Sequence, residues 1–160
     1  MQILFLILMF VIGSVFGSFF CCQVRRAEEK SERRGPKKHS SSLPVYSICL
    51  HCKKKLKWYD NIPIISWLIL RGKCRNCHKK IGYAEIISEV ASALALLLIA
   101  TTINVETATT ENWLQFILVT IFTLSLLFLA IYDGISGELP VIGLIISAIL
   151  ALVLLMFFKA

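Results

Sequence analysis

The sequence has 160 residues, of which 57% are hydrophobic and 17% charged, and its formal net charge is +7. This length is usual for one soluble domain, but the hydrophobic residues gather in long runs instead of alternating with polar ones. The pattern excludes an ordinary soluble protein. A soluble four-helix bundle is disfavoured in particular, because none of the runs has a polar face to present to water.

Four apolar runs are predicted to be transmembrane helices. A bilayer core about 30 Å thick needs roughly 20 helical residues. No run carries a charge in its middle third, and none shows the period-two pattern of barrel strands, so helices are expected. The runs are Ile3–Phe20, Ile86–Ile103, Trp113–Tyr132 and Leu139–Phe158. The expected fold class is an all-α polytopic membrane protein with four transmembrane helices.

The first run has an alternative interpretation as a cleaved secretory signal peptide. Such a peptide needs basic residues before its apolar core and small residues at a cleavage site after it. Met1-Gln2 carries no basic side chain, and Phe19–Cys22 is not a small-residue site. We therefore expect residues 1–24 to form a retained membrane anchor.

The positive charge is concentrated in one segment. All but one of the 17 Lys and Arg residues lie within Arg25–Lys80. The positive-inside rule places this segment in the cytoplasm and the N-terminus outside. The loop Asn104–Asn112 has two acidic and no basic residues, which agrees with an outside position. We attribute the basic charge to topology and attraction to anionic membrane lipid, and expect no nucleic-acid partner.

The chain divides into the first anchor, a cytoplasmic loop at residues 25–84, and a three-helix membrane region at residues 85–160. The loop begins with a charged, Ser-rich stretch, Arg25–Ser42. We expect this stretch to be a flexible linker. The ordered part of the loop is predicted at about residues 45–81.

Two Cys-x-x-Cys pairs with 21 residues between them predict a zinc site in this loop. Four thiolates leave no open coordination position, so the zinc is expected to be structural and the module zinc-ribbon-like. Two disulfides are the alternative, which a reducing cytoplasm disfavours. His51 or His78 could also replace one ligand, and Cys21 and Cys22 are expected to be small buried side chains. The predicted ligands are Cys49, Cys52, Cys74 and Cys77.

Three acidic residues lie where apolar runs begin or end. Asp133 follows the third run, so it is either a functional carboxylate or a solvated charge at a helix end. Glu85 and Glu89 share one helical face. Glu85 can complement the helix dipole, whereas Glu89 lies about a turn deeper and is expected to need a partner, such as an arginine from the loop.

The sequence resembles the N-terminal half of the type IV prepilin peptidase family. The resemblance rests on Gly17-Ser18-Phe19-Phe20 with Arg26, on both cysteine pairs, on Trp58–Trp67 and Leu70–Cys74 between them, on Glu89, and on Asp133 followed after five residues by Leu139-Pro140. These enzymes are bacterial inner-membrane aspartic endopeptidases that remove the leaders of prepilins and pseudopilins. Many also methylate the new N-terminus with S-adenosylmethionine.

The resemblance implies that Asp133 is the first catalytic aspartate and that prepilins or pseudopilins are the substrates. Methylation rests on the resemblance alone. The chain departs from the family at Cys21, at Ala84–Ile86 and at Val141, and it lacks the second aspartate motif, Gly-x-Gly-Asp. Because aspartic catalysis needs two carboxylates, we expect this chain to be the front part of a longer enzyme. The alternatives are a partner chain that supplies the second aspartate, and a chain that has lost proteolysis.

A second hypothesis is a membrane scaffold without enzymatic activity, whose zinc module docks a cytoplasmic partner. A third, a membrane-tethered nucleic-acid binder, would bind with a steep dependence on salt. The missing second aspartate motif is the feature that favours the scaffold.

Overall fold

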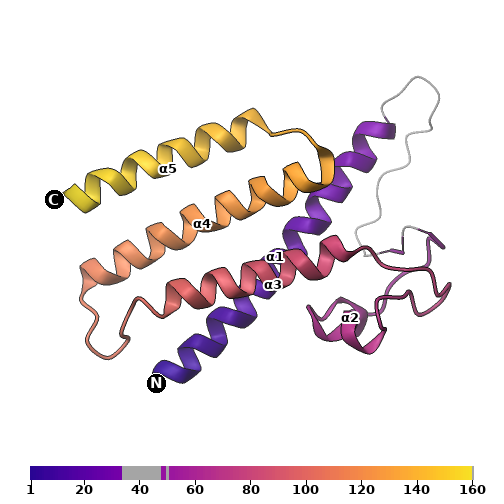
Figure 1. The fold of residues 1–160 in the computed structure, drawn as a ribbon, viewed down its shortest axis with the longest axis horizontal. Coiled ribbons are helices and arrows are strands. Elements are labelled where there is room, and N and C mark those ends of the chain that lie inside the picture. The colour runs from indigo at the N-terminus through magenta and orange to yellow at the C-terminus, as the bar shows by residue number, and fades with distance from the viewer. Residues whose placement is uncertain (34–47, 50, 160) are drawn as a thin grey trace.

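Helices make up most of the computed structural model, which describes residues 1–33, 48–49 and 51–159 (Figure 1). Three helices are long and apolar enough to cross a membrane: α1 (Gln2–Arg33), α3 (Tyr83–Ala100) and α4 (Thr110–Ser136). The helix α5 (Val141–Lys159) is also apolar, but its apolar segment Val141–Met156 is shorter than these three spans. The all-α class and three of the expected spans are thus confirmed by length and composition, and the fourth span stays a prediction.

The first helix extends well beyond the apolar run that predicted it. α1 continues through Arg33, so the prediction of a flexible linker from Arg25 onwards is wrong for residues 25–33. The segment Ala27–Arg33 is rich in Ala, Glu, Lys and Arg, which are strong helix formers. Hydrophobicity measures the length of chain inside a bilayer and not the length of the helix. The rest of the predicted linker and residues 45–47 lie outside the described residues.

Two glycines of α1 allow its backbone to approach α3 closely. A Cβ atom built on Gly13 would lie 2.5 Å from the Ser92 carbonyl oxygen, and one on Gly17 would lie 2.3 Å from that of Ser88. Glycines four residues apart on one helical face are a common device for close packing of membrane helices. The small side chain of Ser92 is fully buried at this contact. The backbones of α1 and α3 are therefore in close contact at Gly13 and Gly17.

α4 packs on this core, and α5 lies antiparallel beside α4 (Figure 1). Aromatic rings join α4 to α1, with the ring centroids of Phe20 and Phe128 5.4 Å apart and those of Phe5 and Trp113 5.8 Å apart. α4 ends where Gly137 adopts a left-handed conformation with φ of 69°, which glycine accommodates without steric cost. This turn leads directly into α5.

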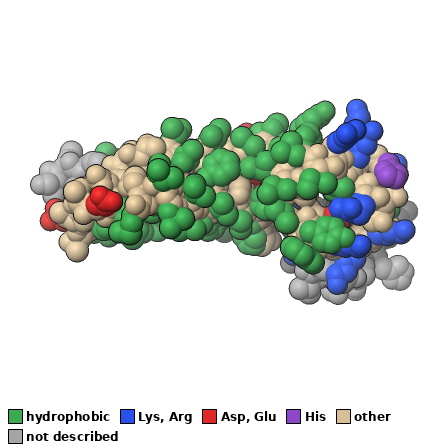
Figure 2. Space-filling model, turned by 90° about the horizontal axis from the view of Figure 1, so that it is seen from below, with side chains coloured by type: hydrophobic (Ala, Val, Ile, Leu, Met, Phe, Trp, Pro, Cys, Tyr) green, Lys and Arg blue, Asp and Glu red, His purple; other side chains and the backbone are tan. Residues whose placement is uncertain are grey.

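The loop between α1 and α3 carries the cysteine module. Its regular elements are the 3-10 helix η1 (Trp58–Asn61) and the short helix α2 (Ile65–Ile69). Figure 2 shows hydrophobic side chains along the length of the helices and Lys and Arg side chains gathered at one end. The apolar belt and the basic end occupy separate parts of the molecule, as a membrane-spanning protein requires.

Candidate metal centre

The two cysteine pairs form two turns with the same backbone pattern. The Cys49 amide donates to the Lys54 carbonyl (3.0 Å) and the Lys53 amide to the Cys49 carbonyl (2.8 Å). In the second turn, the Cys74 amide donates to the Lys79 carbonyl (2.9 Å) and the His78 amide to the Cys74 carbonyl (3.0 Å). Lys53 and His78 also share a positive φ of 55°. The hairpin pairings Ile48–Lys55 and Lys73–Lys80 flank the two turns equivalently.

These turns bring the four predicted thiols together. The sulfur atoms of Cys49, Cys52, Cys74 and Cys77 all lie within 4.8 Å of one another. The Cys49 and Cys77 sulfurs are 3.9 Å apart, and a tetrahedral zinc with Zn–S bonds of about 2.3 Å would place its ligands about 3.8 Å apart. All six cysteines of the chain are free thiols. The cluster therefore fits a tetrahedral thiolate-bound metal. The alternative of two disulfides is not formed, and neither His51 nor His78 belongs to the cluster.

The thiols of the second pair differ in acidity. Backbone amides, first that of Cys77 and then that of Asn76, donate to the Cys74 sulfur and lower the pKa of this thiol to about 7. The Lys79 amide lowers the pKa of Cys77, but burial and hydrogen bonds with neighbouring thiols outweigh it and raise that pKa to about 11. The Cys74 thiolate thus forms readily near neutral pH, whereas a cation would have to displace the proton of Cys77 on binding.

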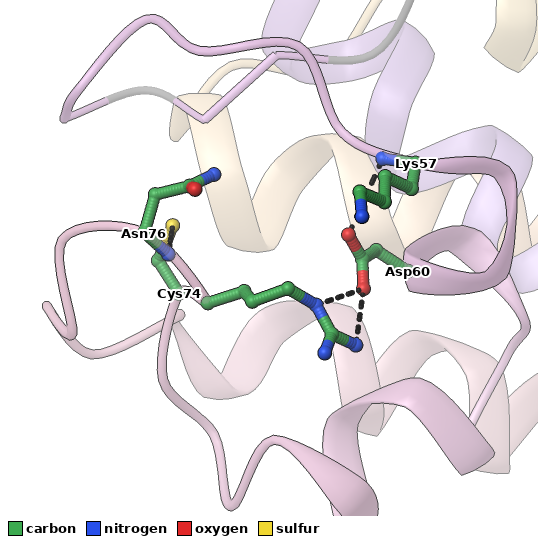
Figure 3. Close-up of polar contacts among 5 residues, drawn as sticks. Lys57, Asp60, Cys74 and Asn76 are labelled. Carbon is green, nitrogen blue, oxygen red and sulfur yellow. Dashed lines mark hydrogen bonds and ion pairs between the residues drawn. The ribbon is translucent and has the colours of Figure 1, made fainter.

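A buried carboxylate braces the second turn (Figure 3). Asp60 Oδ1 accepts from Arg75 Nε (3.0 Å) and Nη2 (2.8 Å), and Asp60 Oδ2 accepts from the Lys57 amide (3.2 Å). The Asp60 side chain is 4% exposed, and the hydrogen bond to Asp60 raises the pKa of Arg75. Because Arg75 lies between the two cysteines of its pair, this contact ties the candidate metal ligands Cys74 and Cys77 to η1. The spacing of the cysteines does not predict the contact between Asp60 and Arg75.

We expect Asp60→Asn to loosen the metal centre without removing a ligand. The amide carries no charge to pair with the Arg75 guanidinium, and it has only one acceptor oxygen for the bonds from Arg75 and from the Lys57 amide. Substitutions of residues that hold metal ligands in place weaken metal binding roughly 10–100-fold. Zinc transfer from the purified protein to a chromophoric chelator would therefore become faster by at least about tenfold. Glu138→Gln is the control, because Glu138 is an exposed carboxylate at the end of α4. Equal transfer rates for the two variants would contradict the bracing role.

Glu89 joins the module to the membrane helices. Its buried carboxylate accepts a hydrogen bond of 2.6 Å from the backbone amide of Ile64, just before α2. The expectation of an arginine partner for Glu89 is wrong, because Arg25 instead pairs with Glu85 at 2.9 Å. The hydrogen bond from the Ile64 amide to Glu89 could not be predicted from residue types, because every residue except proline has a backbone amide that can donate. Glu85, in the first turn of α3, has an ion-pair partner as well as a favourable place on the helix dipole.

A cavity of about 220 Å³ lies between the module and the helix ends. Residues of α1 (Ser18 and Arg25), α2 (Trp67) and α3 (Glu85 and Glu89) line it, together with parts of both cysteine turns. The cavity is therefore lined both by the cysteine turns and by acidic residues of α3.

Residues 11–103 match the bacterial peptidase A24 N-terminal domain. This match covers more than half of the chain and includes both cysteine turns and all of α3. The chain belongs to this peptidase A24 family.

Several curated proteins are similar to part of this chain. A prepilin leader peptidase/N-methyltransferase of Vibrio cholerae is 33% identical over 91 residues, which are 57% of this chain and 36% of that protein. A type 4 prepilin-like proteins leader peptide-processing enzyme of Escherichia coli is 46% identical over 61 residues, 38% of this chain and 22% of that protein. The relative from Myxococcus xanthus, a prepilin leader peptidase/N-methyltransferase, is 35% identical over 91 residues, covering 57% and 24% of the two chains.

The aligned part of the chain thus spans between about a fifth and two fifths of these relatives. No solved structure matches the chain. The resemblance to the prepilin peptidase family predicted from the cysteine pairs and the residues between them is confirmed.

Asp133 lies apart from the metal cluster. It occupies the last turn of α4, its side chain is exposed, and the cavity lining does not include it. The peptidase A24 match also ends before it, at residue 103. The structure therefore brings together the four predicted metal ligands and leaves the predicted catalytic aspartate at a separate helix end.

Proposed function

We propose that this chain is part of a bacterial membrane aspartic endopeptidase that removes the leaders of type IV prepilins or pseudopilins. Membership of the peptidase A24 family carries the proposal, and the printed names of the relatives supply the substrate class. The three long apolar helices support a location in the cytoplasmic membrane. The basic module supports a cytoplasmic position for the metal centre, with the N-terminus outside.

In this proposal, Asp133 is one of the two carboxylates that aspartic proteolysis requires. One carboxyl group acts as base towards the attacking water and the other as acid. The position of Asp133 supports this role, because the end of α4 lies towards the same end of the helices as the module (Figure 1). There a membrane-anchored substrate would present its cleavage point at the cytoplasmic boundary. The second carboxylate is proposed to come from outside residues 1–160, in a longer enzyme or in a partner chain.

The proposed metal is zinc, bound by Cys49, Cys52, Cys74 and Cys77. With four thiolate ligands its contribution is structural: it fixes a module that is too small to be stabilised by a hydrophobic core alone. The module then holds the loop that reaches Glu89 and bounds the cavity. The proposal is confined to peptidase activity, because among these observations only the names of the relatives favour methyl transfer.

Replacing Asp133 by asparagine tests the peptidase proposal. Membranes that contain the chain together with a co-produced chain bearing the second aspartate motif would be incubated with a type IV prepilin, and loss of the leader followed as a mobility shift. We expect Asp133→Asn to abolish cleavage and to leave zinc content unchanged, because the residue lies apart from the cluster. Glu138→Gln, in the same turn region, is the matched control and should still cleave.

Two results would contradict this assignment. Cleavage by Asp133→Asn at the rate of the unaltered chain would remove the catalytic role. Absence of cleavage by the unaltered chain, even when a chain bearing the second aspartate motif is co-produced, would favour a membrane scaffold that docks a partner through its metal module.

A further inference from the structure

The helix α2 presents an apolar face to the outside of the module. Ile65, Leu68 and Ile69 are 54%, 60% and 70% exposed, and their spacing of three and four residues places them on one helical face. The opposite side of α2 faces the cavity, which is lined by Trp67 and by Leu70, the residue that follows the helix. α2 therefore has one apolar face towards the interior of the module and a second apolar face that is exposed. A small module surrounded by water would not be expected to expose such a face.

Two contacts place α2 at the depth of the membrane boundary. The rings of Trp67 and Tyr83, the first residue of α3, lie 6.0 Å apart. The amide of Ile64 reaches Glu89, which lies six residues into α3, or about 9 Å along the helix axis. The 18 residues of α3 span about 27 Å, close to the hydrocarbon thickness of about 30 Å. The start of α2 thus lies about two turns deeper along α3 than Tyr83, the first residue of that membrane-spanning helix.

The surroundings of this face suit a lipid surface that carries negative charge. Arg71, Lys73 and Lys80 follow α2 and are exposed, and the pairing of Lys73 with Lys80 keeps two of them side by side. Trp58, 80% exposed, adds an aromatic residue of the kind that is enriched at headgroup level. Figure 2 shows the Lys and Arg side chains next to hydrophobic side chains at the module end of the apolar belt.

We propose that α2 is an interfacial helix whose face Ile65, Leu68 and Ile69 inserts into the cytoplasmic leaflet, with Arg71 and Lys73 on the phosphates of anionic lipids. Apolar side chains beneath a basic rim are the chemistry of such helices. The metal module is then held against the bilayer by α2 as well as by α1 and α3. This inference rests on the proposed membrane insertion of the chain.

Photo-crosslinking to lipid tests the insertion of α2. The full chain would carry p-benzoylphenylalanine in place of Leu68, Leu98 or Lys54, in vesicles of phosphatidylcholine and phosphatidylglycerol with a trace of alkyne-tagged phospholipid. Leu98 lies on the outer face of α3 and is 68% exposed, whereas Lys54 is an exposed residue of the first cysteine turn. We expect lipid adducts at position 68 within about twofold of those at position 98, and at least about fivefold above those at position 54.

Labelling at positions 68 and 98 distinguishes an α2 that does not insert from a chain that is not in the membrane at all. Labelling at position 98 together with background labelling at position 68 would overturn the interfacial helix. Background labelling at both would overturn membrane insertion itself, and protein adducts in place of lipid adducts at position 68 would make the face a protein-docking surface. Metal content of each variant confirms that the module is intact.

A second experiment tests whether Arg71 and Lys73 bind anionic lipid. Arg71→Gln combined with Lys73→Gln should lower labelling at position 68 in vesicles with phosphatidylglycerol and leave labelling at position 98 unchanged. Equal labelling at position 68 with and without these substitutions would overturn the anionic-lipid part of the proposal.

Discussion

Cys74→Ser should strip the metal from the protein and unfold the cysteine module while the membrane helices stay paired. Cys74 is the most buried of the four ligands, and a serine hydroxyl is a poor replacement for a thiolate on zinc. Structural zinc sites contribute about 10–16 kcal/mol of apparent binding free energy at neutral pH. A module with little hydrophobic core cannot recover such a loss. The α1–α3 contact does not involve the metal and should persist.

Metal analysis and limited proteolysis of the detergent-solubilised protein would check this result. We expect about one zinc per chain in the unaltered protein and close to none in Cys74→Ser, with new cleavage sites confined to residues 48–82. Cys22→Ser is the matched control, since Cys22 is a free thiol of α1 outside the cluster. Metal content that is equal in the two variants would reject the four-cysteine site.

Gly17→Leu should separate α1 from α3 and thereby destabilise the whole membrane part. Even a Cβ at Gly17 would lie 2.3 Å from the Ser88 carbonyl oxygen and 2.7 Å from the Glu89 Cα atom. Both contacts are with the backbone, which cannot rotate away as a flexible side chain would. Overpacking of this kind costs about 1–3 kcal/mol, and occasionally more. Because Glu89 adjoins the clash, its hydrogen bond with the Ile64 amide should be disturbed too.

Thermal unfolding in detergent would measure this effect, with proteolysis of the module as a second readout. Gly17→Ala should lower the midpoint temperature less than Gly17→Leu. Gly134→Ala is the control, because Gly134 lies in α4 with no atom within 4 Å of its added Cβ. Alanine there should be neutral or slightly stabilising, as it is in most helices. A midpoint for Gly17→Leu equal to that of Gly134→Ala would contradict the close α1–α3 packing.

The sequence predicted the positions of three membrane helices, but it did not predict the residues at which these helices end. Apolar runs identified α1, α3 and α4, because a bilayer requires long uncharged stretches. Helix ends depend on other physics: α1 continues through charged residues with high helix propensity, and α4 ends at the left-handed Gly137. Partner helices were also not predictable: the spacing of Gly13 and Gly17 is typical of close helix packing, but it does not identify α3 as the partner.

The site was predictable to the extent that it depends on local spacing. A Cys-x-x-Cys pair determines its own turn, so the four ligands could be named from the sequence. The bond from Arg75 to Asp60 crosses 15 residues, and the bond from Ile64 to Glu89 crosses 25 residues and uses a backbone donor. No spacing rule predicts either. The role of Asp133 stays a prediction.

The equivalence of the two cysteine turns has a consequence for the order of folding. Each turn closes through hydrogen bonds between residues four or five positions apart, so both half-sites can form early and independently. Bringing them together requires closure of the much longer loop between the pairs, and the entropic cost of closure grows only with the logarithm of loop length. The Asp60–Arg75 bond spans 15 residues of this loop, and a metal ion bound by both pairs would hold the loop closed. The rate at which the module matures should therefore follow the supply of metal more than the speed of chain folding.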